Sequence, residues 1–186
     1  MASRRPSTSL TAALSGAALI AALGSGGDAG AASRIGACST ADLTATVAVH
    51  LAAVTQEHPI LITLRNHSQS GCTLRGYPEP KLLNKSGTAL PFAVSHSGDR
   101  QVTSHRPVLV LLAPGGPAFV LLGMTTCQTR RRTDAPILDL RLPGGSGRFR
   151  LRLRGPASFC GRGQVGSTIH VSPFERTFLA TSAGAS

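Results

Sequence analysis

The clearest pattern in the sequence is the alternation of apolar and polar positions over short segments. In residues 59–78, apolar side chains occupy every second position from Ile60 to Leu64, and β-branched residues are frequent. The polar segment 66–71 (NHSQSG) favours a chain reversal. Alternation resumes at Cys72, and a proline closes the segment. This pattern predicts a β-hairpin that carries Cys72 on its second strand.

Similar short segments, separated by Gly, Pro and polar turns, recur along the chain. Segments 107–112 and 118–122 are continuously apolar, which suits strands covered on both faces. Segment 148–154 alternates most cleanly, so its arginines are expected to point outward and its Phe and Leu residues inward. Strands are expected within residues 43–51, 60–65, 72–75, 81–84, 89–94, 107–112, 118–122, 137–142, 148–154 and 168–171. We predict an all-β fold, an immunoglobulin-like β-sandwich of about nine strands.

Composition adds detail to this picture. Hydrophobic residues make up 41% of the chain, enough for one core, whereas aromatic residues make up 4% and Trp is absent. The core is therefore expected to consist mostly of Leu, Val, Ile and Ala. The 21 Gly and 12 Pro residues favour many turns over long helices.

The N-terminus has the order of features found in a secretory signal peptide. Two arginines are followed by the apolar run 10–23 and then by small residues that fit cleavage after Ala31 or Ala32. We predict a cleaved helical signal peptide at 1–32, a β-sandwich domain at 33–180 and a flexible tail at 181–186. A buried N-terminal helix is the alternative. No later stretch is long and apolar enough to span a membrane, so a secreted or extracytoplasmic location is expected.

The four cysteines all follow the predicted leader. An even number in an exported chain indicates two disulfides, for which three pairings are possible. We favour pairs that are close in the chain, Cys38 with Cys72 and Cys127 with Cys160. A zinc site is less consistent with the sequence, since no C-x-x-C pair is present. Residues 35–38 (IGAC) also resemble a lipobox, in which Cys38 would carry a lipid anchor, but they do not adjoin the apolar run.

Several segments of the chain together carry the pattern of a known family. The most specific segment is Cys72 to Pro78 (CTLRGYP), and the others are 37–39 followed by Leu43, 64–66, 112–116, Cys127, and Cys160 with 171–174. In these segments the chain resembles the domain-of-unknown-function 4232 family of secreted actinobacterial proteins. The resemblance implies an exported β-sandwich, often part of a lipoprotein, with two disulfides. It implies no activity. The loop 129–132 and the arginine-rich strand make this chain more basic than the family resemblance leads us to expect.

The strong positive charge points to anionic partners. The formal charge is +11, and it falls to about +10 when Arg4, Arg5 and Asp28 are removed with the leader. A polyanion-binding stripe is predicted along two adjacent strands, with a second cluster at its end: Arg141, Arg148, Arg150, Arg152 and Arg154, then Arg130, Arg131 and Arg132. A solvated sheet face is the alternative. Nucleic acid is not expected as a partner, because stacking aromatic residues are missing beside the charges.

The sequence contains no recognisable catalytic or metal-binding motif. The six histidines (His50, His58, His67, His96, His105 and His170) lack ligand spacing, and no G-x-S-x-G elbow is present. We therefore expect no cofactor, no metal and no enzymatic activity. The expected function is an exported binding or structural module of the cell envelope or exterior. The alternatives are a binder of anionic envelope polymers and an extracytoplasmic hydrolase whose site is assembled only in the fold.

Overall fold

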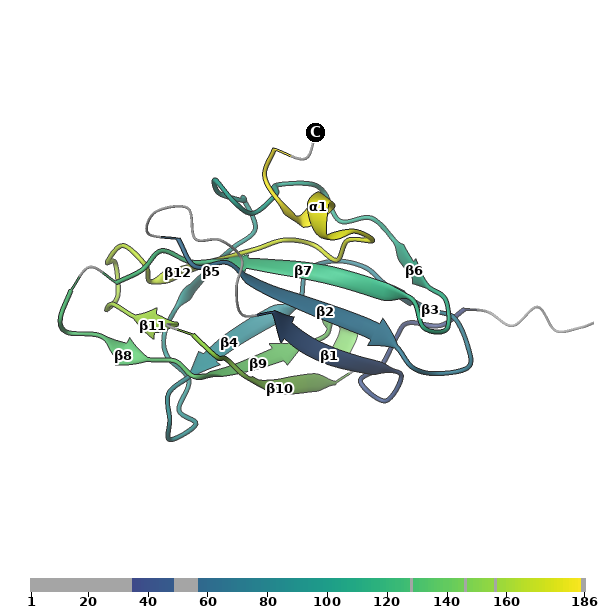
Figure 1. The fold of residues 1–186 in the computed structure, drawn as a ribbon, viewed down its shortest axis with the longest axis horizontal. Helices are drawn as coiled ribbons and strands as arrows, with labels where there is room; N and C mark the ends of the chain where they lie inside the picture. Colours follow the sequence, from purple (N-terminus) through teal and green to yellow (C-terminus); the bar gives the residue numbers. More distant parts are fainter. Residues whose placement is uncertain (1–34, 49–56, 128, 146, 156, 185–186) are drawn as a thin grey trace, which may run out of the picture. The chain divides into compact units, whose positions relative to one another are not determined.

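Strands and loops make up nearly all of the structure (Figure 1), a computed structural model that describes residues 35–48, 57–127, 129–145, 147–155 and 157–184. Among these residues, only the short helix α1 (Phe178–Thr181) and the 3-10 turn η1 (Pro143–Gly145) are helical. The all-β prediction is therefore confirmed. The predicted signal peptide lies outside the described residues.

The larger of two main sheets has five strands in the order β1-β2-β7-β12-β5. All neighbours are antiparallel except β12 and β5, which are parallel. The strands are β1 (Leu43–Ala48), β2 (Ile60–Asn66), β5 (Ala93–Ser95), β7 (Pro117–Gly123) and β12 (Thr168–Val171). The first predicted strand, 43–51, is thus present up to Ala48, and its last residues lie outside the described part of the chain.

The second main sheet has three antiparallel strands in the order β10-β9-β4. These strands are β4 (Glu79–Leu83), β9 (Ile137–Arg141) and β10 (Arg148–Arg152). Two small two-stranded sheets complete the fold. They pair β3 (Cys72–Leu74) with β6 (Val110–Leu112) and β8 (Thr133–Asp134) with β11 (Ser158–Phe159). The strand count in the described residues is twelve rather than about nine, because several strands are only two or three residues long.

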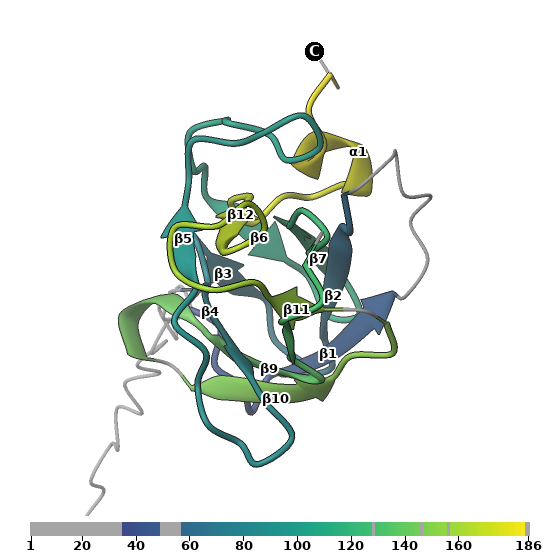
Figure 2. The same ribbon diagram turned by 90° about the vertical axis from the view of Figure 1, so that its left-hand side faces the viewer.

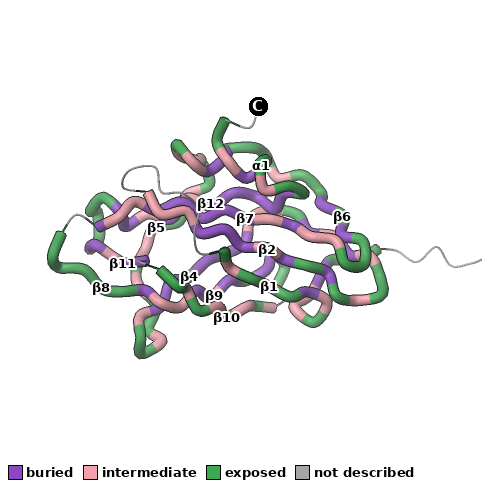
Figure 3. Tube along the Cα trace, viewed as in Figure 1, coloured by how far each residue is buried: buried purple, intermediate pink, exposed green. Residues whose placement is uncertain are grey.

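The two main sheets face each other across one hydrophobic core (Figures 1 and 2). Ile62 and Leu64 from β2 and Leu138 and Leu140 from β9 are completely inaccessible to solvent. Figure 3 shows the buried residues along β2, β7, β9 and β12, with most exposed residues in the loops and at the edges of the domain. Phe174 is also completely buried, but most of the core consists of Leu, Val and Ile, as the composition predicts. Burial of the inward apolar surface is the main stabilising contribution to this fold.

The outer face of the five-stranded sheet is partly covered by a smaller hydrophobic cluster. Leu61 of β2 and Leu121 of β7 pack there with Val102, and Phe178 of α1 contacts the same cluster. Apolar residues at adjacent positions of β7 therefore face two different cores. This arrangement confirms the expectation that segment 118–122 is covered on both faces.

The same expectation is wrong for segment 107–112. Val110 and Leu112 are buried, whereas Val108, Leu109 and Leu111 are 54%, 56% and 47% exposed. The reason is that β6 pairs only with β3 and nothing in the described residues covers its outer face. A continuous apolar run can therefore have one exposed face.

The hairpin predicted for residues 59–78 is also wrong, although both of its strands exist. Both edges of β2 are occupied, by β1 and β7, and β3 pairs with β6 in a different sheet. The polar segment 66–71 is thus a crossover between two layers instead of a hairpin turn. Alternation along one segment predicts a strand but does not identify its partner.

Two further expectations concern the C-terminal half. Segments 137–142 and 148–154 do form an antiparallel pair, in which Arg141 lies opposite Arg148. In contrast, the tail expected to be flexible from residue 181 is held by the domain as far as Ala183. The Thr181 carbonyl oxygen accepts a hydrogen bond from Thr103 N–H, and Ala183 N–H donates to the Gln101 carbonyl oxygen.

Candidate anion-binding face

The outer face of the three-stranded sheet carries a cluster of cationic side chains. On β10, Phe149 and Leu151 pack against the core while Arg148, Arg150 and Arg152 are exposed on the opposite face. Antiparallel pairing with β9 adds Arg141 opposite Arg148, and pairing of β9 with β4 adds a lysine. We refer to the residues Lys81, Arg141, Arg148, Arg150 and Arg152 as the basic face.

Two carboxylates on the same face neutralise part of this charge. Arg141 Nη1 lies 3.8 Å from Glu79 Oε2, and Arg148 Nη1 lies 3.5 Å from Asp139 Oδ2. The two arginine side chains are 54% and 69% exposed, so each ion pair contributes only about 0–1 kcal/mol. Arg141 and Arg148 are therefore held loosely, and an external anion can compete with their partners.

The other two arginines of the basic face have no carboxylate partner. Neither Arg150 nor Arg152 forms an ion pair with any described residue. Arg150 extends toward the turn after β4, where its Nη2 atom lies 3.0 Å from the position that a Cβ on Gly87 would occupy. With five cations and two carboxylates on the sheet face, the formal charge is +3, and each of the three sets of residues paired across the sheet carries +1.

The remaining predicted arginines lie outside the basic face. Arg130, Arg131 and Arg132 are exposed in the loop before β8, and the chain then enters β9 at the end where Ile137 pairs with Arg152. The exposed Arg154 follows β10 and borders a small cavity of about 60 Å³, which is lined mainly by apolar residues that include Met124. The sequence pattern does not predict Lys81 as part of this face, because its position there depends on the pairing of β4 with β9.

A second group of polar residues gathers near the segment 172–177 between β12 and α1, which we refer to as the C-terminal strap. Glu175 is buried, and its Oε1 atom lies 3.8 Å from Nδ1 of His105. Burial raises the pKa of Glu175, while the nearby His105 charge acts in the opposite direction. Tyr77 donates a hydrogen bond to the His105 carbonyl oxygen at 3.2 Å, and its ring stacks on His96 at 4.0 Å between centroids. Sequence spacing gives no indication of this cluster, because its members come from four separate segments.

The structure does not gather the histidines that it describes into a metal site. In the part of the chain that the structure describes, no three His, Cys, Asp or Glu side chains form a group able to hold a metal ion. His50 lies outside that part. Among the described residues, no helix has the length and apolar character needed to cross a membrane.

All four cysteines are bonded in disulfides. Cys38 pairs with Cys72 and Cys127 with Cys160, which is the pairing favoured among the three that the sequence permits. Two disulfides indicate an extracytoplasmic location. Since the Cys38 sulfur is bonded to Cys72, this disulfide and a lipid anchor on Cys38 exclude each other.

Comparison with known families identifies the domain. A family described as "Domain of unknown function (DUF4232)" matches residues 38–175. The chain belongs to the DUF4232 family. No curated protein and no solved structure matches the chain.

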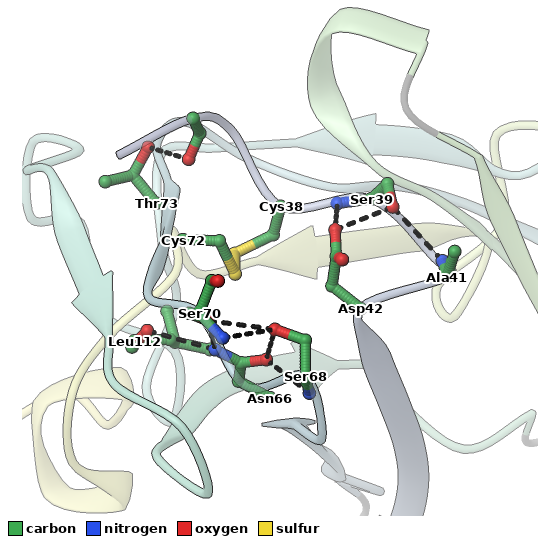
Figure 4. The surroundings of a disulfide bond; sticks show 11 residues. Cys38, Ser39, Ala41, Asp42, Asn66, Ser68, Ser70, Cys72, Thr73 and Leu112 are labelled. Atoms are coloured by element: carbon green, nitrogen blue, oxygen red, sulfur yellow. Dashed lines mark hydrogen bonds between the residues drawn. A yellow bond between two sulfur atoms is a disulfide. The ribbon is translucent and has the colours of Figure 1, made fainter. Parts of the chain in front are cut away.

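The DUF4232 domain begins at the Cys38–Cys72 disulfide, whose surroundings Figure 4 shows. Nearby, the fully buried Asn66 donates from Nδ2 to the carbonyl oxygens of Ser70 at 2.8 Å and Leu112 at 3.2 Å. Its backbone N–H donates to Gly116, and its carbonyl oxygen accepts from Gly115 N–H. Asn66 therefore joins the 66–71 crossover to the turn between β6 and β7.

The CTLRGYP segment of the DUF4232 domain contacts the C-terminal strap through Gly76. Gly76 has a φ of +99°, which favours glycine, and its carbonyl oxygen accepts a hydrogen bond from Phe174 N–H at 3.2 Å. Ser172 similarly accepts from Leu121 N–H through its hydroxyl oxygen at 2.9 Å. The family segments 72–78 and 171–174 therefore fix the C-terminal strap against the sandwich. The basic face lies on a different surface of the domain.

Proposed function

We propose that this DUF4232 protein is an exported, non-enzymatic binding module, and that its basic face binds an anionic polymer of the cell envelope or exterior. The observation that carries the proposal is a pair of exposed guanidinium groups, Arg150 and Arg152, beside three further cations on one sheet face. Neither group pairs with a carboxylate in the part of the chain that the structure describes. Arginine presents planar pairs of N–H donors that suit phosphate, sulfate and carboxylate groups.

Several observations support the other parts of the proposal. The N-terminal sequence pattern and the two disulfides support export. The cysteines are bonded to one another, so none of the four is free to act as a nucleophile. The outer surface of a sheet also suits a long polymer better than a small enclosed substrate, which would require a concave pocket.

The experiment is a salt titration of binding to heparin, polyphosphate and poly(glycerol phosphate) by isothermal titration calorimetry. The test variant is R150S/R152S, and the matched control is R100S/R106S, which removes the same charge from two exposed positions between β5 and β6. We expect wild-type affinity to fall steeply with salt. The test variant should bind at least tenfold more weakly, and its slope of log K against log salt should be smaller by about 1.4.

Two results would contradict the proposal. If none of the three polymers binds, the module has another kind of partner. If R150S/R152S and R100S/R106S lose the same affinity, net charge and not the basic face is responsible. Circular dichroism and retained disulfides would verify that both variants are folded.

One observation favours the alternative of an extracytoplasmic hydrolase. Glu175 is a buried carboxylate with a raised pKa beside His105, a combination found in acid–base catalysis. The test is hydrolysis of ester, glycoside and phosphate substrates by the wild-type protein at pH 5 and pH 7, with E175Q as the comparison. Activity that E175Q abolishes would establish this alternative, whereas a wild-type protein inactive on every substrate would remove its support.

A further inference from the structure

The cations of the basic face form a row along β10 rather than an even patch. On an antiparallel strand, residues on the same face recur at about 6.8 Å. Arg148, Arg150 and Arg152 follow this repeat. Across the sheet, the neighbour of Arg150 is Asp139 and the neighbour of Arg152 is Ile137. A polymer that lies along β10 thus meets a guanidinium at each repeat, whereas a polymer that crosses the sheet at these positions meets a carboxylate or an apolar side chain.

The spacing of the row limits the charge spacing of a matching polymer. Charges much closer together than the arginine repeat leave anionic groups between guanidinium groups without a partner. Charges one disaccharide apart leave arginines without a partner. A phosphodiester every three carbons, as in poly(glycerol phosphate), gives a repeat close to that of the arginines, and each phosphate can accept two N–H donors from one guanidinium.

We propose that the ligand of the basic face is a thin, flexible phosphodiester polymer that lies lengthwise along β10, with successive phosphates on Arg148, Arg150 and Arg152. This inference rests on the proposed function and specifies its ligand. Three successive phosphates fill the row, so affinity should rise steeply with oligomer length up to about three phosphates and more slowly beyond, by analogy with counterion release per neutralised phosphate.

Asp139 has a defined role in this arrangement. Its carboxylate pairs with Arg148 and lies beside Arg150 in the register of the sheet, so it competes with phosphate for the first arginine of the row. Replacement of Asp139 by Asn removes this competition with little change of shape. The Arg148 side chain of this pair is 69% exposed and the Asp139 side chain 16%. An ion pair of about 0.2–1 kcal/mol corresponds to a gain in affinity of about 1.4- to fivefold.

The experiment compares oligomers with equal numbers of charges: poly(glycerol phosphate), polyphosphate and hyaluronate. Binding to the full-length secreted protein is measured by calorimetry at one salt concentration. Wild type should prefer poly(glycerol phosphate) by about threefold or more, and R150S/R152S should lose this preference. D139N should bind poly(glycerol phosphate) more tightly, while the charge-matched control D134N, which alters an exposed carboxylate of β8, should change affinity less.

The outcomes separate this inference from the function on which it rests. Equal affinity for all three polymers, with loss of binding in R150S/R152S, would overturn the spacing inference and leave the polyanion-binding function in place. A preference for hyaluronate or polyphosphate would likewise overturn the spacing inference and leave the polyanion-binding function in place. Unchanged binding by D139N would show that Arg148 does not belong to the row, which overturns the lengthwise placement. No binding to any polymer would overturn both proposals.

Discussion

At the scale of single residues, Glu175 illustrates how the fold changes the chemistry of a side chain. Its backbone N–H and carbonyl oxygen both bond to Phe119, which holds the strap residue against β7. The carboxyl group is buried, with its side chain only 11% exposed, and the neighbouring His105 side chain is half exposed. Loss of hydration disfavours the ionised form, and the pKa of Glu175 rises.

This raised pKa predicts a dependence of stability on pH. Between the ordinary pKa of about 4.3 and the raised value, the folded protein binds more protons than the unfolded protein. The free energy of unfolding should therefore decrease as the pH rises through this window, and E175Q should lack that contribution. Urea denaturation of both proteins from pH 4 to pH 7 checks the difference. Parallel stability curves for E175Q and wild type would contradict the prediction.

At the scale of elements, β6 shows that adjacent apolar residues can have very different energetic roles. Leu112 is 1% exposed and belongs to the main core, whereas its neighbour Leu111 is 47% exposed on the outer face. Both belong to a strand that pairs with β3 through Cys72 and Leu74. The strand is therefore held by one face only.

Alanine substitution at these two leucines tests the orientation of β6. L112A should lower the free energy of unfolding by about 2–5 kcal/mol, since it removes buried methyl groups and leaves a cavity. L111A should change it by no more than about 0.5 kcal/mol, as expected for a surface substitution. Equilibrium denaturation of the two variants provides the measurement, and each serves as the control for the other. Similar losses in both would mean that the outer face of β6 is covered.

At the scale of the whole molecule, the two disulfides join segments that the sheets alone do not hold. Cys38 links the segment before β1 to β3, where Cys38 N–H also donates to the Thr73 carbonyl oxygen at 2.9 Å. Cys127, in the loop after β7, links this loop to the one after β11. The chain separations are 34 and 33 residues, so each disulfide removes a similar amount of entropy from the unfolded chain.

Removal of either disulfide should therefore lower the free energy of unfolding substantially. The variants C38S/C72S and C127S/C160S should each lose about 3–4 kcal/mol of unfolding free energy, a large part of the total stability of a domain of this size. Denaturation with and without reductant checks the prediction on the wild-type protein as well. A midpoint that does not move on full reduction would show that the sheets hold the fold without covalent help.

The basic face shows how far the sequence could predict a candidate site. Alternation along 148–154 places the arginines outward because a strand has a repeat of two residues. The same alternation says nothing about Asp139 and Lys81, which reach this face only through the pairing of β9 with β10 and β4. Which arginines are partnered and which are free therefore depends on the register between strands.

The sequence by itself determined the all-β character, most strand positions, the favoured disulfide pairing and the family segments, because these depend on local periodicity, turn residues and chain separation. The tertiary structure decided that residues 60–66 and 72–74 join different sheets, that β6 is exposed on one side, and that Tyr77, His96, His105 and Glu175 meet. These features require contacts between distant segments. Such contacts are selected by the packing of the whole core, which no single segment encodes.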